Sequence, residues 1–164
     1  MELKAKNFEC IKEDNSEEEN ERQWENSKIV FDEFRKYLSG KNYKDELIER
    51  QLGYSSFFMM NYFFVYEGKM SVLETEEITI RTFLGNWYIR KNWSPNFKEM
   101  KEILSALFDF FEFAHTKEFI TREQFEQVKQ VCKDKDWFET RLKTYKTADG
   151  INFKKWIEEY NYDW

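Results

Sequence analysis

The chain has 164 residues, a length that suits one domain with a small appendage. One proline and five glycines leave few chain breakers, which favours long helices with short connections over a β fold with many turns. A net charge of −6 excludes the strongly basic composition typical of nucleic-acid-binding proteins, but it allows a local basic patch.

The first part of the chain is acidic and the rest is nearly neutral. Residues 1–27 carry nine acidic and four basic side chains, whereas the other 137 residues carry 23 and 22. Residues 1–15 show no clear periodicity and are taken as an N-terminal segment. Ser16 and Glu19 fit a capping box, so the first long helix is expected to begin there and to end at Ser39 and Gly40.

Two further helices are expected before residue 93. The first runs from about Lys44 to Tyr66, and its second half is apolar on nearly all sides, which predicts burial. Gly53 interrupts this helix and is a candidate for a close helix crossing. The next helix is expected to start at Thr75 as its cap and to end near Asn92.

The most apolar helix is expected between Ser94 and Ala114. Ser94 is a capping residue, and Pro95 suits the first helical position. Large apolar residues then recur at steps of three and four, as on one face of a helix. This segment is therefore predicted to be the central helix.

Shorter helices are expected after this segment. Thr121 and Gln124 form a second capping box, and Asp134 is a candidate cap for the helix after it. Asp149 and Gly150 predict a turn before a last short amphipathic helix. The chain is thus interpreted as an N-terminal segment (1–15), a helical domain (16–121) and a helical extension packed on that domain (122–164).

Two phrases in the middle of the chain resemble the core-binding N-terminal domain of tyrosine recombinases, the SAM-like domain of phage integrases. The first is LETEEITIRTFLGNW, with matches at Thr75, Glu76, Glu77, Ile78, Arg81, Phe83 and Leu84. The second lies in the central helix, with matches at Ser94, Pro95, Leu104, Ser105, Ala106, Leu107, Phe110, Phe111 and Phe113. The resemblance covers about residues 43–121 and implies an all-α, SAM-like integrase N-terminal-type bundle with additional C-terminal helices.

The same resemblance implies DNA as a partner, without recombinase catalysis. Relatives cut DNA with a separate C-terminal domain that has a His-x-x-Arg box, whereas His115 here is followed by Thr116, Lys117 and Glu118. Too few residues follow Thr121 to form that domain. Arginines that relatives place on the central helix are replaced, which implies weak DNA binding because affinity depends on neutralising phosphates.

Seven basic side chains are the candidates for a surface that faces phosphate groups. The alternative for each is a solvated helix face with acidic partners three or four residues away. The candidate DNA-binding residues are Lys41, Lys44, Arg50, Arg90, Lys91, Lys98 and Lys101.

No residue pattern indicates catalysis, a metal or a cofactor. His115 has no identifiable acid–base partner in the sequence, and one histidine with Cys10 and Cys132 is too few for a four-ligand zinc site. Two cysteines without a disulfide framework, and no long apolar span, favour a reduced cytoplasmic protein. Tryptophan and phenylalanine side chains could stack on bases, but their helical spacing favours core packing.

The sequence therefore predicts a non-catalytic, recombinase-derived module that binds double-stranded DNA weakly or assists DNA integration and recombination. A recombinase or another protein is a further expected partner, and no membrane partner is expected. The alternative is a protein–protein interaction or scaffold module that keeps the fold without DNA binding.

Overall fold

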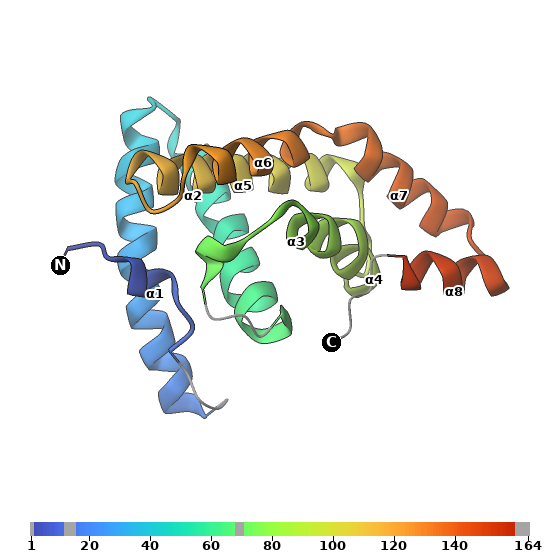
Figure 1. The fold of residues 1–164 in the computed structure, drawn as a ribbon, viewed down its shortest axis with the longest axis horizontal. Coiled ribbons are helices and arrows are strands. Elements are labelled where there is room, and N and C mark those ends of the chain that lie inside the picture. Colours follow the sequence, from blue (N-terminus) through green and yellow to red (C-terminus); the bar gives the residue numbers. More distant parts are fainter. Residues whose placement is uncertain (1, 12–15, 68–70, 160–164) are drawn as a thin grey trace.

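The structure is a computed structural model that describes residues 2–11, 16–67 and 71–159 (Figure 1). Within these ranges every regular element is a helix, and the one β feature is an isolated bridge between Glu9 and Ser71. The predicted all-α class is confirmed for the described residues. The elements are η1 (Ala5–Phe8), α1 (Glu17–Gly40), α2 (Asp45–Ser56), η2 (Phe57–Glu67), η3 (Val72–Glu74), α3 (Glu77–Thr82), η4 (Phe83–Trp87), α4 (Tyr88–Lys91), α5 (Phe97–Thr116), α6 (Arg122–Lys133), α7 (Lys135–Thr147) and α8 (Gly150–Glu158).

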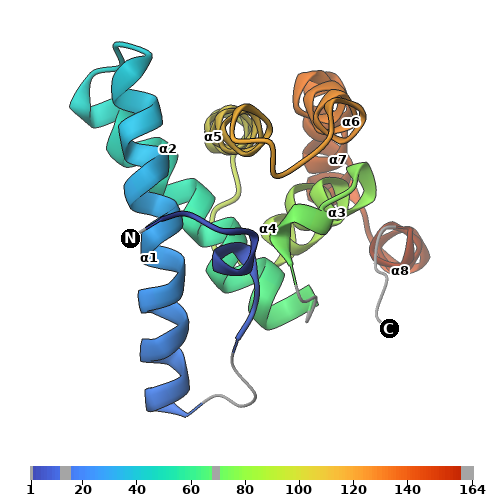
Figure 2. The same cartoon turned by 60° about the vertical axis from the view of Figure 1, so that its left-hand side comes forward.

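Helix α5 is the central element of the fold. Ten of its 20 residues are buried, because its apolar side chains cover more than one face. It contacts α1, α2, α6 and α7. Figure 2 looks nearly along α5, with α1 and α2 on one side and α6 and α7 on the other. None of the helices in the described ranges is long and apolar enough to cross a membrane.

Two helix starts follow the predicted capping. The hydroxyl of Ser16 accepts a hydrogen bond from the Glu19 amide at 3.3 Å, and Thr121 accepts one from the Gln124 amide at 3.2 Å. The Gln124 side chain also accepts from the Thr121 amide, which completes a capping box. These starts depend only on residues three positions apart, so the sequence could define them.

Two other predicted caps were wrong. Helix α5 begins after Asn96 rather than Ser94, because the Asn96 side chain accepts from the Glu99 amide at 2.9 Å. Thr75 donates its hydroxyl to a carbonyl of η3, and Glu76 takes the cap position of α3. At α5 the second capping side chain, two residues further along, reaches the helix instead, whereas at α3 the Thr79 hydroxyl accepts from the Glu76 amide at 3.4 Å.

The predicted helix from about residue 44 to residue 66 is present as α2 continuing into η2. Both η2 and η4 are π-helical, and each lies within or at the end of a longer helical rod. Aromatic rings from the two segments interlock. The Phe83 ring lies 5.0 Å from that of Phe58 and 4.8 Å from that of Tyr62, and Trp87 lies 5.3 Å from Tyr62. These ring pairs join the two rods.

The close helix contact involves Gly85, and the prediction for Gly53 was wrong. A Cβ atom added at Gly53 would meet nothing within 4 Å. A Cβ atom at Gly85 would lie 2.5 Å from Cζ3 of the Trp137 ring. Glycine in η4 therefore allows α7 to approach.

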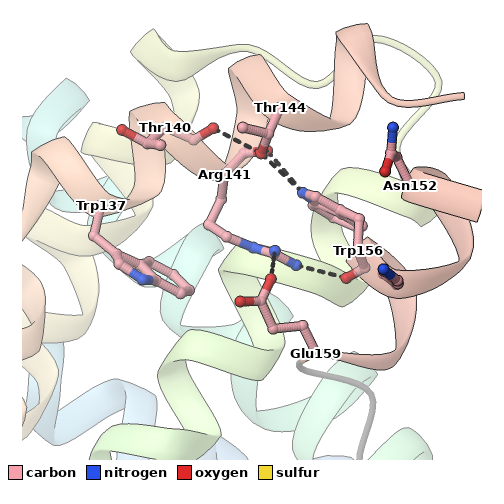
Figure 3. A pocket seen from close by; sticks show the side chains of 8 residues that line it. Trp137, Thr140, Arg141, Thr144, Asn152, Trp156 and Glu159 are labelled. Carbon is pink, nitrogen blue, oxygen red and sulfur yellow. Dashed lines mark hydrogen bonds and ion pairs between the residues drawn. The ribbon is translucent and has the colours of Figure 1, made fainter.

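The C-terminal helices are tied to the rest of the fold through Arg141, which is buried. Its Nε donates to the Gly85 carbonyl at 3.2 Å. Its Nη2 donates to the Trp156 carbonyl at 3.0 Å (Figure 3). The guanidinium also lies over the Trp156 ring, 3.8 Å from its centroid. The Asn86 amide donates to the Ile157 carbonyl at 2.9 Å. Side chains of α7 and η4 therefore satisfy carbonyls at the end of α8.

The N-terminal segment contributes to the core through Phe8. This side chain is fully buried, and its ring lies 6.2 Å from that of Phe110 and 5.1 Å from that of Phe119. The Gln23 amide on α1 holds the same segment by donating to the Glu9 carbonyl at 3.1 Å. Weak periodicity in residues 1–15 thus concealed a core phenylalanine.

Candidate nucleic-acid interface

The seven basic residues predicted to contact DNA do not gather in one place. Helices α2 and α5 run antiparallel. Lys41, just before α2, pairs with Asp109, whereas Arg50, further along α2, pairs with Glu102, which lies two turns before Asp109 in α5. Lys44 therefore lies near the second half of α5. Lys98 precedes Asp109 by eleven residues, or about 16 Å along the helix. The structure separates Lys41 and Lys44 from Arg90, Lys91, Lys98 and Lys101, with Arg50 between the two groups.

The structure places Lys41 in an internal network. Its ammonium nitrogen lies 2.7 Å from Asp109 Oδ1 and 2.6 Å from Glu112 Oε2. Tyr37 donates its hydroxyl to Glu112 at 2.7 Å, and the Gln51 amide donates to Asp109 Oδ2 at 2.6 Å. The Asp109 side chain is only 3% exposed, so the network links the α1–α2 turn to the centre of α5.

The network shifts the titration of its members. Burial opposes the charge on Lys41, but the hydrogen bonds to Asp109 and Glu112 outweigh it and raise the pKa of Lys41. Burial also opposes the charge on Glu112, yet the bonds from Lys41 and Tyr37 lower its pKa. Burial, together with the bond to Glu112, raises the pKa of Tyr37 to about 12. Lys41 is thus a structural cation whose contacts point inward.

Arg50 and Arg90 also have partners within the protein. Arg50 Nη1 lies 3.4 Å from Glu102 Oε1, and Arg90 Nε donates to the Asn86 side chain at 2.6 Å. Lys44 precedes the first residue of α2 and is exposed. These contacts hold parts of both guanidinium groups against the fold.

The remaining candidates surround the loop that joins α4 to α5. We call this region the α4–α5 tip and define it by Arg90, Lys91, Trp93, Lys98 and Lys101. Lys91, Lys98 and Lys101 are exposed, and the ammonium of Lys101 lies 5.0 Å from the centroid of the Phe97 ring. The segment from residue 88 to residue 101 contains four basic side chains and one acidic one.

The single acidic side chain of this segment, Glu99, is turned toward the helices. Its Oε2 accepts a short hydrogen bond from Tyr88 OH at 2.5 Å and another from the Asn92 amide at 3.4 Å. Its Oε1 is 3.5 Å from Tyr54 OH. Desolvation by burial, with the Glu99 and Glu102 carboxylates close by, raises the pKa of Tyr54 to about 12. The carboxylate therefore joins α4 to α5, whereas the lysines of the tip, Lys91, Lys98 and Lys101, are exposed.

Trp93 is the functional candidate that the sequence interpretation missed. Its side chain is fully exposed, although aromatic residues were expected to be in the core. The available signal was its position: Trp93 lies between two helices, immediately before Ser94 and Pro95, and so belongs to no helical face. Basic and aromatic side chains interleave here, an arrangement that suits nucleic-acid backbones and bases.

His115 and Cys132 occupy structural positions. Nδ1 of His115 lies 3.3 Å from the Ile120 carbonyl oxygen, and its ring stacks on Phe125 with centroids 5.3 Å apart. Cys132 is buried, and burial raises the pKa of its thiol to about 12, which keeps it protonated. Among the described residues no group of three or more histidine, cysteine or acidic side chains could hold a metal ion.

A groove of about 610 Å³ between the C-terminal helices is built around the same Arg141 (Figure 3). The buried guanidinium of Arg141 donates to the Glu159 carboxylate at 2.8 Å, in addition to its hydrogen bonds to the carbonyls of Gly85 and Trp156. The Trp156 indole N–H also donates to the Thr144 hydroxyl at 3.0 Å. The hydrogen bonds of Arg141 and Trp156 therefore hold α7 and α8 together, and these polar groups of the groove are used in contacts within the protein.

The fold and the tip define an all-α protein with an exposed basic and aromatic loop. No protein-family model, curated protein or solved structure matches this chain.

Proposed function

We propose that this chain is a non-catalytic, recombinase-derived helical module that binds DNA through the α4–α5 tip. The proposal keeps the function expected from the resemblance, DNA binding with an accessory role in integration or recombination. It narrows the contact surface to the four basic residues that meet at the tip. Lys41 is assigned to the internal network, and Lys44 lies outside the contact surface.

The observation that carries the proposal is the exposure of Trp93 among the basic side chains of the tip. Lys91, Lys98 and Lys101 are exposed on either side of the loop. Phosphate contacts supply most of the affinity of sequence-independent DNA binding, and four basic side chains can neutralise at most four phosphates. Together with the net charge of −6, this number predicts weak binding that is seen at low salt.

A salt titration with a labelled duplex tests this proposal. We expect the logarithm of the binding constant to fall with the logarithm of salt concentration, with a slope of about −3 to −4. Replacing Lys91, Lys98 or Lys101 by alanine should weaken binding and reduce the steepness by about one for each lysine. Fluorescence anisotropy between about 25 and 200 mM salt measures both quantities.

Lys44→Ala is the matched control. It also removes an exposed lysine, but Lys44 lies at the start of α2, near the second half of α5 and away from the α4–α5 tip. It should leave affinity and slope unchanged. The proposed function is wrong if the wild-type protein binds no DNA at low salt, or if Lys44→Ala and the tip variants weaken binding equally.

A second candidate function, protein binding without DNA, is favoured by exposed apolar side chains away from the tip. Val65 at the end of η2 is 59% exposed, and Ile151 on α8 is 76% exposed. Such side chains occur at protein contacts when they belong to a larger patch. Sedimentation velocity tests self-association: Ile151→Asp and Val65→Asp should convert a dimer to a monomer, and a wild-type monomer at all concentrations would contradict self-association.

A further inference from the structure

Trp93 is presented to solvent by a loop that is held in place. The Asn92 side chain accepts from the Ser94 amide at 2.9 Å and also donates to Glu99. Asn96 caps α5 on the other side of the loop and donates to the Ser94 carbonyl at 3.4 Å. The backbone of the loop that carries Trp93 is therefore held in place before any partner arrives, which lowers the backbone entropy lost on binding.

The indole itself is left uncovered by the described part of the fold. Among the described residues no ring, hydrogen-bonding group or cation contacts Trp93, and its side chain is fully exposed. Other tryptophans of the described ranges, such as Trp137 and Trp156, pack against arginine and glycine. A large flat ring that the protein leaves uncovered is suited to stack on another flat ring.

We propose that Trp93 stacks on an unpaired base, so that the α4–α5 tip prefers single-stranded DNA to closed duplex. The inference rests on the proposed function, because the tip lysines would hold the phosphates on either side of that base. In a closed duplex both faces of each base are already stacked on neighbours, and an indole gains little. In a single strand the face of a base is open, and stacking on an aromatic side chain is tolerant of sequence.

Two labelled probes separate stacking from phosphate binding. One is an oligothymidylate of about 20 nucleotides, and the other is a duplex of about that length whose ends are closed by non-nucleotide linkers. We expect the wild-type protein to bind the oligothymidylate more tightly. Trp93→Ala should weaken that binding by about 5- to 150-fold, the range found when stacking aromatics are replaced by alanine. Binding to the closed duplex should not change.

The salt slope and two control variants complete the test. Trp93→Ala removes no positive charge, so the slope should stay the same on both probes. Trp93→Phe should keep much of the preference, and Trp24→Ala, which removes a half-exposed indole from α1, should have no effect. Because the Trp93 side chain is fully exposed, its replacement should leave the thermal unfolding midpoint unchanged.

The outcomes distinguish this inference from the function on which it rests. Equal loss on both probes, or no loss with Trp93→Ala, overturns the stacking inference even where the lysine variants show that the tip binds DNA. Failure of the wild-type protein to bind either probe at low salt overturns the proposed function, and the stacking inference with it.

Discussion

At Lys41, the environment of one ammonium group is determined by side chains far along the chain. Asp109 and Glu112 are 68 and 71 residues away from it in sequence, yet both lie within 2.7 Å of its nitrogen. A half-buried cation between two carboxylates stabilises the fold most while all three groups keep their charges, because loss of the ammonium leaves two acids facing each other and loss of either carboxylate charge weakens the hold on Lys41. The pH dependence of stability should therefore report on this network.

We predict that Glu112→Gln lowers the free energy of unfolding at pH 7 by about 1–2 kcal/mol, because it removes a charged acceptor from Lys41 and Tyr37. The pKa of Glu112 is lowered in the folded protein, so its carboxylate contributes stability above the ordinary value of 4.5. That contribution is lost as the pH falls from 4.5 through the lowered pKa. The difference in the free energy of unfolding between Glu112→Gln and the wild-type protein should then shrink toward zero.

Urea unfolding at pH 7 and at about pH 3 measures this difference. Glu49→Gln is a suitable control, because Glu49 pairs with Arg35 on the surface and is 61% exposed. Its replacement should change stability little at either pH. A Glu112→Gln effect of the same size at both pH values would show that the carboxylate charge does not stabilise the network.

At the scale of elements, the two π-helical segments determine how the rods meet. Aromatic rings of η2 and η4 interlock. The Trp137 ring of α7 also packs closely against the backbone of η4 at Gly85. The Trp137 ring fills the space that a side chain at position 85 would need. Packing of this kind is sensitive to single methyl groups, because protein interiors have few voids.

Gly85→Ala and Gly53→Ala should therefore have opposite effects. Gly85→Ala is expected to destabilise the protein by about 1–3 kcal/mol, since Trp137 must move to admit the methyl group. Gly53→Ala, in an exposed part of α2, should stabilise it by about 0.5–1 kcal/mol through better helix propensity. Thermal unfolding of the two variants measures the contrast, and equal effects would contradict the assigned helix contact.

At the scale of the whole molecule, the side chain of Arg141 joins the last helix, α8, to both α7 and η4. Arg141 is a buried residue of α7 that bonds the Gly85 carbonyl in η4 and the Trp156 carbonyl in α8. Helix α8 itself buries one residue, Trp156, so hydrogen bonds from Arg141 and Asn86 and the bond from the Trp156 indole to Thr144 carry much of its attachment. Loss of the guanidinium should open α8 locally before the rest of the fold unfolds.

We predict that Arg141→Met increases hydrogen exchange in residues 150–158 by about 10- to 100-fold, because it leaves buried carbonyls without donors. Exchange in α5 should change much less. Lys143→Met is the control, since Lys143 lies on the same helix but is 69% exposed and pairs with Glu139. Mass spectrometry of the exchanged protein measures each segment, and unchanged exchange in α8 would contradict the role of Arg141.

The sequence by itself determined the helical class and the features that depend on neighbouring residues. Helix starts at Ser16 and Thr121, and the burial of α5, follow from side chains three or four positions apart. Such spacing is a local property of a helix, so it can be recognised without knowing the fold.

Only the tertiary structure decided which charged and aromatic side chains face water. Lys41 and Lys98 look alike in sequence, but Lys41 meets acids from α5 whereas Lys98 is exposed. Gly53 and Gly85 also look alike, yet only Gly85 meets another helix. Trp93 belongs to no predicted helical face, and only the fold shows that its side chain is fully exposed. The burial and partners of these residues depend on segments distant in sequence, and those segments come together only when the chain packs.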